Sequence, residues 1–211
     1  MFAILSNLAL LIPAGTAWKY NRLLTAFIFF SECFISMFYH ICDYFGVCIF
    51  NFQALHYFDF FFAQWIIPRM GFYLIVFTVY YEWVEWMMLL FAALAIALLE
   101  VWFPGTLVVQ AGIAAATMLI VVFYWVFWEF PEYYWSNLLI GVSLLMLSIS
   151  FYVFQTLYSP YYDVIHGFWH ISASLGAHFV IVSRPPAGKY ENAANRINNK
   201  FGRLWAIRVI T

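Results

Sequence analysis

The sequence predicts an all-α, polytopic membrane protein in which seven transmembrane helices form one bundle. Of its 211 residues, 66% are hydrophobic and only 9% are charged, whereas soluble domains carry about 25% charged residues. Apolar runs such as residues 87–99 show no alternation of polar and apolar side chains, which argues against the strands of a membrane barrel. Aromatic residues make up 24% of the chain, and Trp and Tyr prefer the lipid headgroup layer. The composition therefore favours helices that cross a bilayer.

The first three predicted spans are residues 2–18, 23–42 and 52–80. Each supplies the roughly 20 apolar residues that a helix needs to cross a hydrocarbon core. The polar turn Lys19–Arg22 ends the first span, and Asp43 and Gly46 lie where the second ends. The third stretch is long for one span and contains Pro68 followed by Arg69. We therefore expect a tilted or proline-kinked helix there.

The remaining predicted spans are residues 84–102, 106–128, 135–157 and 161–182. Pro104 and Gly105 separate the first two of these, and Glu129 and Pro131 end the second. The sequence after the last span is polar. We therefore divide the chain into a transmembrane domain, residues 1–183, and a basic C-terminal tail, residues 184–211.

The basic residues predict the orientation of the bundle. Eight of the nine fall in two groups, Lys19 and Arg22 after the first span and Arg184, Lys189, Arg196, Lys200, Arg203 and Arg208 in the tail. Seven spans place both groups on the same side of the membrane, and basic residues concentrate on the inner side. We therefore expect an integral membrane protein with its N-terminus outside and its C-terminus inside. The tail can lie on the membrane surface, contact a partner, or remain solvated.

Polar residues inside the spans mark a candidate site, because ionisable groups are costly in lipid. Ser36 and His40 are four residues apart in the second span, Asp59 lies in the third, and His166 and His170 are four apart in the seventh. Residues four apart share one face of a helix, so His166 and His170 can bind one metal ion together. Zinc usually requires a third protein ligand. The predicted topology places all five residues in the outer half of the membrane, and we expect one shared metal site.

Each of these residues also has a purely structural interpretation. The histidines can pack or bind haem, Asp59 can bond to a neighbouring helix, and Ser36 can bond to a carbonyl of its own helix. We assign His56 and His178 to packing or to an interface, because neither has a partner at a useful spacing.

The SxxxH motif of the second span, Asp59 and the HxxxH motif of the seventh span resemble the CREST superfamily. This superfamily contains alkaline ceramidases, progestin/adipoQ receptors and myomaker-like (transmembrane-protein-eight) proteins. The resemblance is closest to the last group, in the segments LALLIPAGTAWKYNRLL, FYHICD, LHYFDF and YYDVIHGFWHISASLG. It covers the first third of the chain and the last span.

The resemblance implies a zinc ion bound by His40, His166 and His170. It further implies that Asp59 holds or deprotonates the zinc-bound water and that Ser36 lies behind the ligands or near a developing oxyanion. Zinc lowers the pKa of a bound water to about 7 and polarises carbonyl groups. The implied activity is hydrolysis of a lipid amide or ester that reaches the site from the membrane.

Two further functions remain open on the sequence alone. The chain can serve as a non-catalytic scaffold or accessory subunit of a larger membrane complex, for example an energy-transducing one, through its aromatic surface and its tail. It can also act as a receptor or fusion protein, as some relatives in the superfamily do, although its loops offer little room for a protein ligand. Membrane lipids are the expected partners, and the net charge of −1 argues against nucleic acid.

Cys42 and Cys48 flank the connection between the second and third spans. They can form a disulfide if the outer side is oxidising, or they can remain reduced and buried.

Overall fold

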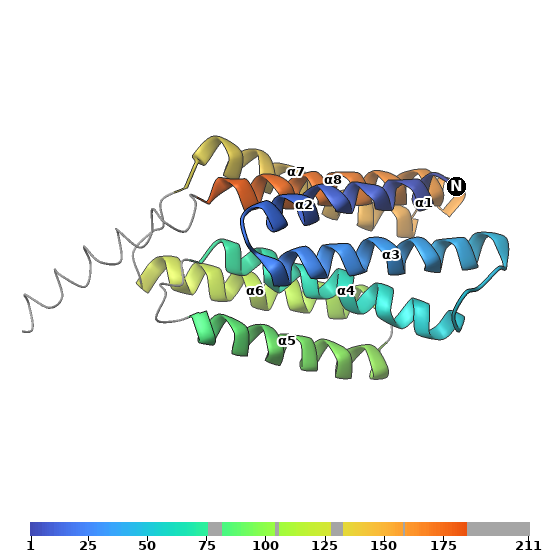
Figure 1. Cartoon of the computed structure of the whole chain (residues 1–211), viewed down its shortest axis with the longest axis horizontal. Coiled ribbons are helices and arrows are strands. Elements are labelled where there is room, and N and C mark those ends of the chain that lie inside the picture. Colours follow the sequence, from blue (N-terminus) through green and yellow to red (C-terminus); the bar gives the residue numbers. More distant parts are fainter. Residues whose placement is uncertain (76–81, 104–105, 128–132, 158, 185–211) are drawn as a thin grey trace, which may run out of the picture.

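The computed structural model describes residues 1–75, 82–103, 106–127, 133–157 and 159–184. The helices, in chain order, are α1 (Phe2–Ser6), η1 (Asn7–Leu10), α2 (Leu11–Lys19), α3 (Leu23–Phe45), α4 (Phe52–Tyr73), α5 (Glu82–Trp102), α6 (Leu107–Phe127), α7 (Trp135–Leu157), η3 (Ser159–Tyr161) and α8 (Tyr162–Ser183). The long helices run side by side (Figure 1). No strand occurs within these described ranges, so the all-α prediction is confirmed.

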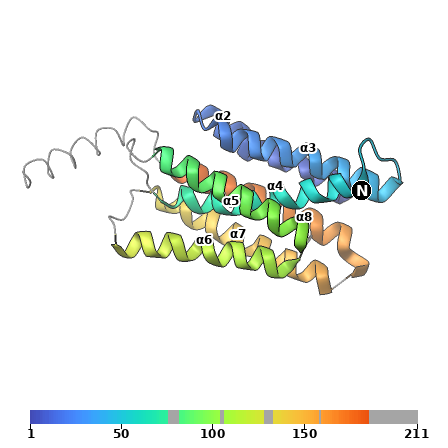
Figure 2. The same cartoon turned by 90° about the horizontal axis from the view of Figure 1, so that it is seen from below.

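Five segments are long and apolar enough to cross a membrane, namely Phe2–Lys19, Leu23–Phe45, Val108–Val126, Trp135–Gln155 and Tyr162–Ser183. The apolar part of α5, Trp86–Trp102, is shorter. Helix α4 is more polar because it carries Asp59, Gln64 and Arg69, all of which are buried. It packs against α3, α5, α6 and α8, and Figure 2 shows it between α3 and α6. Its polar side chains therefore face protein rather than lipid.

A short 3₁₀ turn interrupts the first membrane segment. Helix η1, Asn7–Leu10, lies between α1 and α2, and Pro13 follows in the first turn of α2. Proline has no N–H to donate to the carbonyl four residues earlier, and tighter 3₁₀ turns are common where such bonds are lost. The predicted span at residues 2–18 is therefore one segment made of three short helices.

The connection between α3 and α4 is fixed at both ends. Helix α3 ends at Gly46, whose φ of +68° is favourable for glycine. The Asn51 side chain accepts hydrogen bonds from the backbone N–H groups of Gln53 and Ala54 and so caps α4. Cys42 in the last turn of α3 and Cys48 in the connection form a disulfide. Of the two alternatives for these cysteines, the structure has the disulfide.

The third predicted span ends earlier than expected. Helix α4 continues through Pro68 and ends at Tyr73, whereas the sequence predicted helix to residue 80; residues 76–81 lie outside the described ranges. The Leu74 carbonyl at this helix end accepts hydrogen bonds from Trp125 Nε1 at 2.8 Å and from the Tyr133 hydroxyl at 2.6 Å. Side chains from elsewhere in the chain thus satisfy a carbonyl that a longer helix would have bonded internally.

Helices α7 and α8 approach each other closely at two glycines. A Cβ atom on Gly141 would lie 2.9 Å from the Val180 backbone nitrogen, and one on Gly176 would lie 3.0 Å from the Leu145 backbone nitrogen. Small residues let helix backbones approach in this way. The tight α7–α8 contact fixes the rotation of α8 and therefore the direction of its histidines.

The predicted tail begins inside the bundle. Arg184 is buried, and its guanidinium lies 5.5 Å from the centre of the Tyr73 ring, which Arg69 also approaches. The rest of the predicted tail, residues 185–211, lies outside the described residues.

Candidate metal centre

Three histidines from two helices meet near one end of the bundle. His40 comes from α3, and His166 and His170 come from α8. His166 Nε2 lies 2.9 Å from His40 Nε2 and 3.0 Å from His170 Nε2. The three candidate ligand atoms all lie within 4.8 Å of one another, and all three side chains are buried. The structure thus brings together the three histidines that the sequence singled out.

Helix register explains why they meet. His40 lies five residues before the end of α3 and His166 four residues after the start of α8. At a rise of 1.5 Å per residue, both lie about 6–8 Å from the same end of the bundle. His170 is one turn further along α8, so its ring lies deeper in the bundle than that of His166.

Gln155 orients the central histidine. Its side-chain oxygen lies 2.7 Å from His166 Nδ1, so this nitrogen carries the proton and donates it to the amide. The lone pair of Nε2 is therefore directed at His40 and His170. Gln155 is buried near the end of α7. The sequence analysis missed it, although a polar residue in the last turn of an apolar span was the signal available.

The donor set fits a zinc ion. With Nδ1 protonated, His166 Nε2 has one lone pair in the ring plane, which cannot accept a hydrogen bond from both neighbouring rings with good geometry. A metal ion would resolve this, because His40, His166 and His170 could each supply one lone pair to it. Zinc–nitrogen distances of about 2.0–2.1 Å in a tetrahedron correspond to nitrogens about 3.3 Å apart. The observed separations of 2.9 and 3.0 Å need to open by only a few tenths of an ångström.

Ser36 and Asp59 lie next to each other but outside this ligand group. Both are buried, on α3 and α4, and the Ser36 hydroxyl interacts with the Asp59 carboxyl. Among the described residues, Ser36 Oγ and Asp59 Oδ1 complete no hydrogen bond. By contrast, Ser172 and Ser174 donate to carbonyls of their own helix. The structural interpretation of Ser36 as a backbone-bonded serine is therefore wrong.

The two remaining histidines are packed as expected. His178 Nδ1 lies 2.8 Å from the Thr16 hydroxyl. His56 stacks among aromatic rings, including those of Tyr39 and Phe60. Neither belongs to the three-histidine group.

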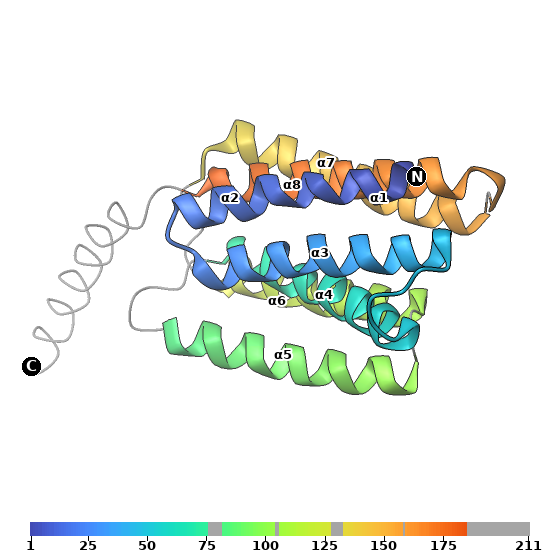
Figure 3. The same cartoon turned by 45° about the vertical axis from the view of Figure 1, so that its right-hand side comes forward.

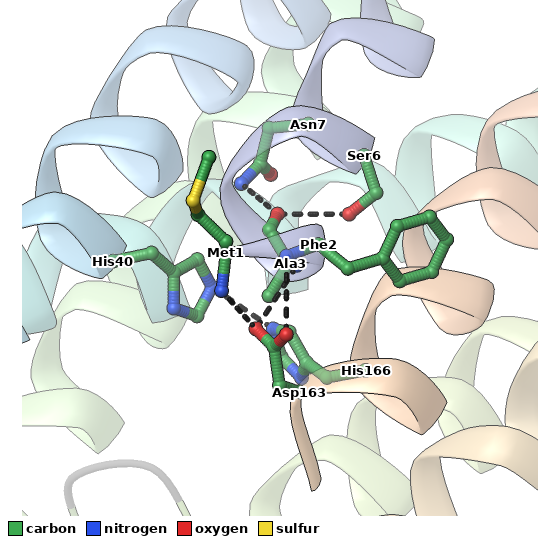
Figure 4. Close-up of polar contacts among 8 residues, drawn as sticks. All are labelled: Met1, Phe2, Ala3, Ser6, Asn7, His40, Asp163 and His166. Atoms are coloured by element: carbon green, nitrogen blue, oxygen red, sulfur yellow. Dashed lines mark hydrogen bonds and ion pairs between the residues drawn. The ribbon is translucent and has the colours of Figure 1, made fainter. Parts of the chain in front are cut away.

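Asp163 ties the start of the chain to the first turn of α8, a contact that was not predicted from the sequence. Its carboxylate accepts hydrogen bonds from the Met1 amino group at 2.9 Å and from the backbone N–H groups of Phe2 and Ala3 at 3.0 and 3.2 Å. Figure 4 shows this carboxylate beside the rings of His40 and His166, and Figure 3 shows the N-terminus beside the adjoining end of α8. Asp163 therefore holds α1 against the first turn of α8.

A protein-family model described as "Protein of unknown function (DUF3522)" matches residues 1–171. The matched part contains the three histidines, Ser36, Asp59 and Gln155. No curated protein matches the chain. Because this family model matches most of the sequence, the chain belongs to this family of unknown function, DUF3522.

Proposed function

We propose that this protein is a CREST-like membrane hydrolase that uses zinc bound by His40, His166 and His170 to cleave lipid amides or esters. The observation that carries the proposal is the convergence of three buried Nε2 atoms, with Gln155 fixing the proton on the far side of His166. Metal-binding histidines are commonly oriented in this way through their other ring nitrogen. Three protein ligands leave a fourth position for water, as in catalytic zinc sites.

In this proposal Asp59 acts on the attacking water and Ser36 acts on the oxygen of the substrate carbonyl. Bound zinc supplies an acidified water and a polarising charge for the substrate carbonyl. The Asp59 carboxylate accepts the proton of the attacking water. The Ser36 hydroxyl, which makes no bond to its own helix in the described structure, donates to the oxygen that develops negative charge.

The position of the site favours a lipid substrate. The three histidines lie on membrane-spanning segments, about 6–12 Å from the helix ends, and their side chains are buried. An amide or ester bond near the headgroup of a lipid reaches this depth without leaving the membrane.

The proposed orientation keeps the N-terminus and the histidines on the outer side and the C-terminus inside. Disulfides persist in oxidising compartments, and the Cys42–Cys48 bond lies at the histidine end of α3. The exposed Lys19 is the last residue of α2, and α2 ends at the end of the bundle opposite the N-terminus (Figure 1), in agreement with the positive-inside rule.

The test combines metal content with lipid turnover. We expect the purified protein to hold about one zinc ion per chain and to release fatty acid from a panel of lipid amides and esters. The double substitution His166→Ala, His170→Ala should remove both the zinc and the turnover. His178→Ala, on the same helix but outside the site, should retain both. Zinc without turnover on any lipid would reject the enzymatic part, and absence of zinc from the wild-type protein would reject the metal site.

A second candidate is a non-catalytic subunit of a larger membrane assembly, contacting other subunits through its aromatic surface and tail. It is favoured by α6 and α7, whose membrane segments are only 11% and 17% buried. Their apolar faces contact either lipid or another protein. Co-purification of stoichiometric subunits in mild detergent, lost when α6 surface residues such as Phe123 are replaced by Ala, would favour this role. A monodisperse single chain would count against it.

A further inference from the structure

Glu32 is a buried acidic residue that lies deeper in the bundle than the three histidines. Glu32 is 2% exposed and lies on α3, one turn before Ser36 and two turns before His40. This places it about 12 Å further into the bundle than His40. It interacts electrostatically with Asp59 across the α3–α4 contact. The proposed hydrolysis assigns Glu32 no role.

Three oxygen atoms around this point lack partners. Glu32 Oε2, Ser36 Oγ and Asp59 Oδ1 are fully buried and make no hydrogen bond among the described residues. Ser36 is one turn from Glu32 on α3 and lies beside Asp59 of α4, the helix that packs against α3. A buried polar atom without a partner is costly and requires an explanation.

The carboxyl groups of Glu32 and Asp59 also have no ion-pair partner among the described residues. Arg69, the buried cation of α4, bonds to Thr25, which lies about 10 Å from Glu32 along α3. Two carboxylates in a low-dielectric interior require a compensating charge. A proton on Glu32 would remove one of the two charges and would leave that of Asp59 uncompensated.

We infer that Glu32, Ser36 and Asp59 form a second cation site between α3 and α4, separate from the three histidines. A bound cation compensates the carboxylates and occupies the three unpartnered oxygens at once. The donors are all oxygen, which suits hard cations such as calcium or sodium, whereas the imidazoles nearer the helix ends suit zinc. The Ser36 hydroxyl keeps its proton when its oxygen binds a cation, so its proposed donor role is unaffected.

The test measures cation binding through stability and needs no substrate. The purified full chain is heated in choline chloride, and sodium chloride or micromolar to millimolar calcium chloride replaces part of the choline at constant ionic strength. We expect one of the two cations to raise the melting temperature of the wild-type protein in a saturable way. Glu32→Gln should weaken this effect at least about tenfold, because it removes a buried charge from the site.

A buried glutamate elsewhere gives the matched control. Glu100 on α5 is 1% exposed and accepts a hydrogen bond from Gln64, so Glu100→Gln should leave the cation response unchanged. Ser36→Ala is a milder second variant, which should reduce the affinity and keep the protein monodisperse. Zinc content is measured in parallel, so that loss of the zinc site is distinguished from loss of this one.

Two results would overturn the inference. The first is a wild-type protein that neither sodium nor calcium stabilises more than choline does. The second is a cation effect of equal size in the wild type, Glu32→Gln and Ser36→Ala, since the cation would then bind elsewhere.

Discussion

The two sides of the bundle differ in what their helices bury. The membrane segments formed by α3 and α8 are 44% and 50% buried, whereas those of α6 and α7 are 11% and 17% buried. The three histidines, Ser36 and Glu32 all lie on the first pair. The exposed side chains of α6 and α7 are mostly large and apolar.

This difference indicates a division of roles. In lipid, an apolar helix face needs no protein partner, so α6 and α7 can remain exposed. Polar groups must be enclosed by protein, so α3, α4 and α8 pack together around them. We therefore expect substitutions on the polar side to affect metal binding and stability far more than those on the apolar side.

The largest expected effect concerns Gln155, through which α7 contacts His166. Gln155→Leu removes the acceptor for His166 Nδ1–H and should weaken zinc binding about 10- to 100-fold, the usual effect of losing such a partner. Competition with a zinc chelator measures the affinity. Ser150→Ala, on the same helix with its hydroxyl bonded to Met146, is the control. Equal affinities for Gln155→Leu and the wild type would remove Gln155 from the site.

Two glycines compare a helix face in contact with α8 and a face without such a contact. Gly141→Ala on α7 places a Cβ against the backbone of α8, whereas the Cβ of Gly112→Ala on α6 would meet nothing within 4 Å. We expect the first to destabilise the protein by about 1–3 kcal/mol. The second should be neutral or stabilising by up to about 1 kcal/mol, because Ala is the better helix former. Thermal unfolding in detergent measures both, and similar shifts would show that Gly141 is not closely packed against α8.

The next effect on stability is expected from removal of the Cys42–Cys48 disulfide. Loop-closure entropy for a ring of this size is worth about 2 kcal/mol, so Cys42→Ser with Cys48→Ser should destabilise the protein by about that amount. Cys33 is a buried thiol that lies outside the ring. Reducing agent should therefore destabilise the wild type and leave the double serine variant unchanged. An equal response of both proteins would show that the bond does not form.

The smallest expected effect is at Asp163. Its side chain is 44% exposed, so Asp163→Asn should cost less than about 1 kcal/mol. The amides of Phe2 and Ala3, which donate to it, should nevertheless exchange hydrogen faster. Asp43→Asn, an exposed acid at the end of α3, is the control. Unchanged exchange at both amides would show that another contact holds α1.

The sequence predicted much of this architecture and part of the site. Hydropathy and helix rise locate the spans and the depth of each polar residue, which is why His40, His166 and His170 were grouped correctly. Residue spacing does not show which way each helix is turned towards its neighbours. The contact between Gln155 and His166 follows from that rotation and emerged only from the structure. The early end of α4 likewise depends on Trp125 and Tyr133, which are distant in sequence.

The central claim is that His40, His166 and His170 bind one zinc ion through Nε2. X-ray absorption spectroscopy of the purified, metal-replete protein tests it most directly. We expect a zinc centre with three nitrogen ligands at about 2.0–2.1 Å and one oxygen ligand. We further expect this signal to be lost in His166→Ala, His170→Ala. A protein without zinc, or a zinc centre that survives the double substitution, would contradict zinc binding by these three histidines.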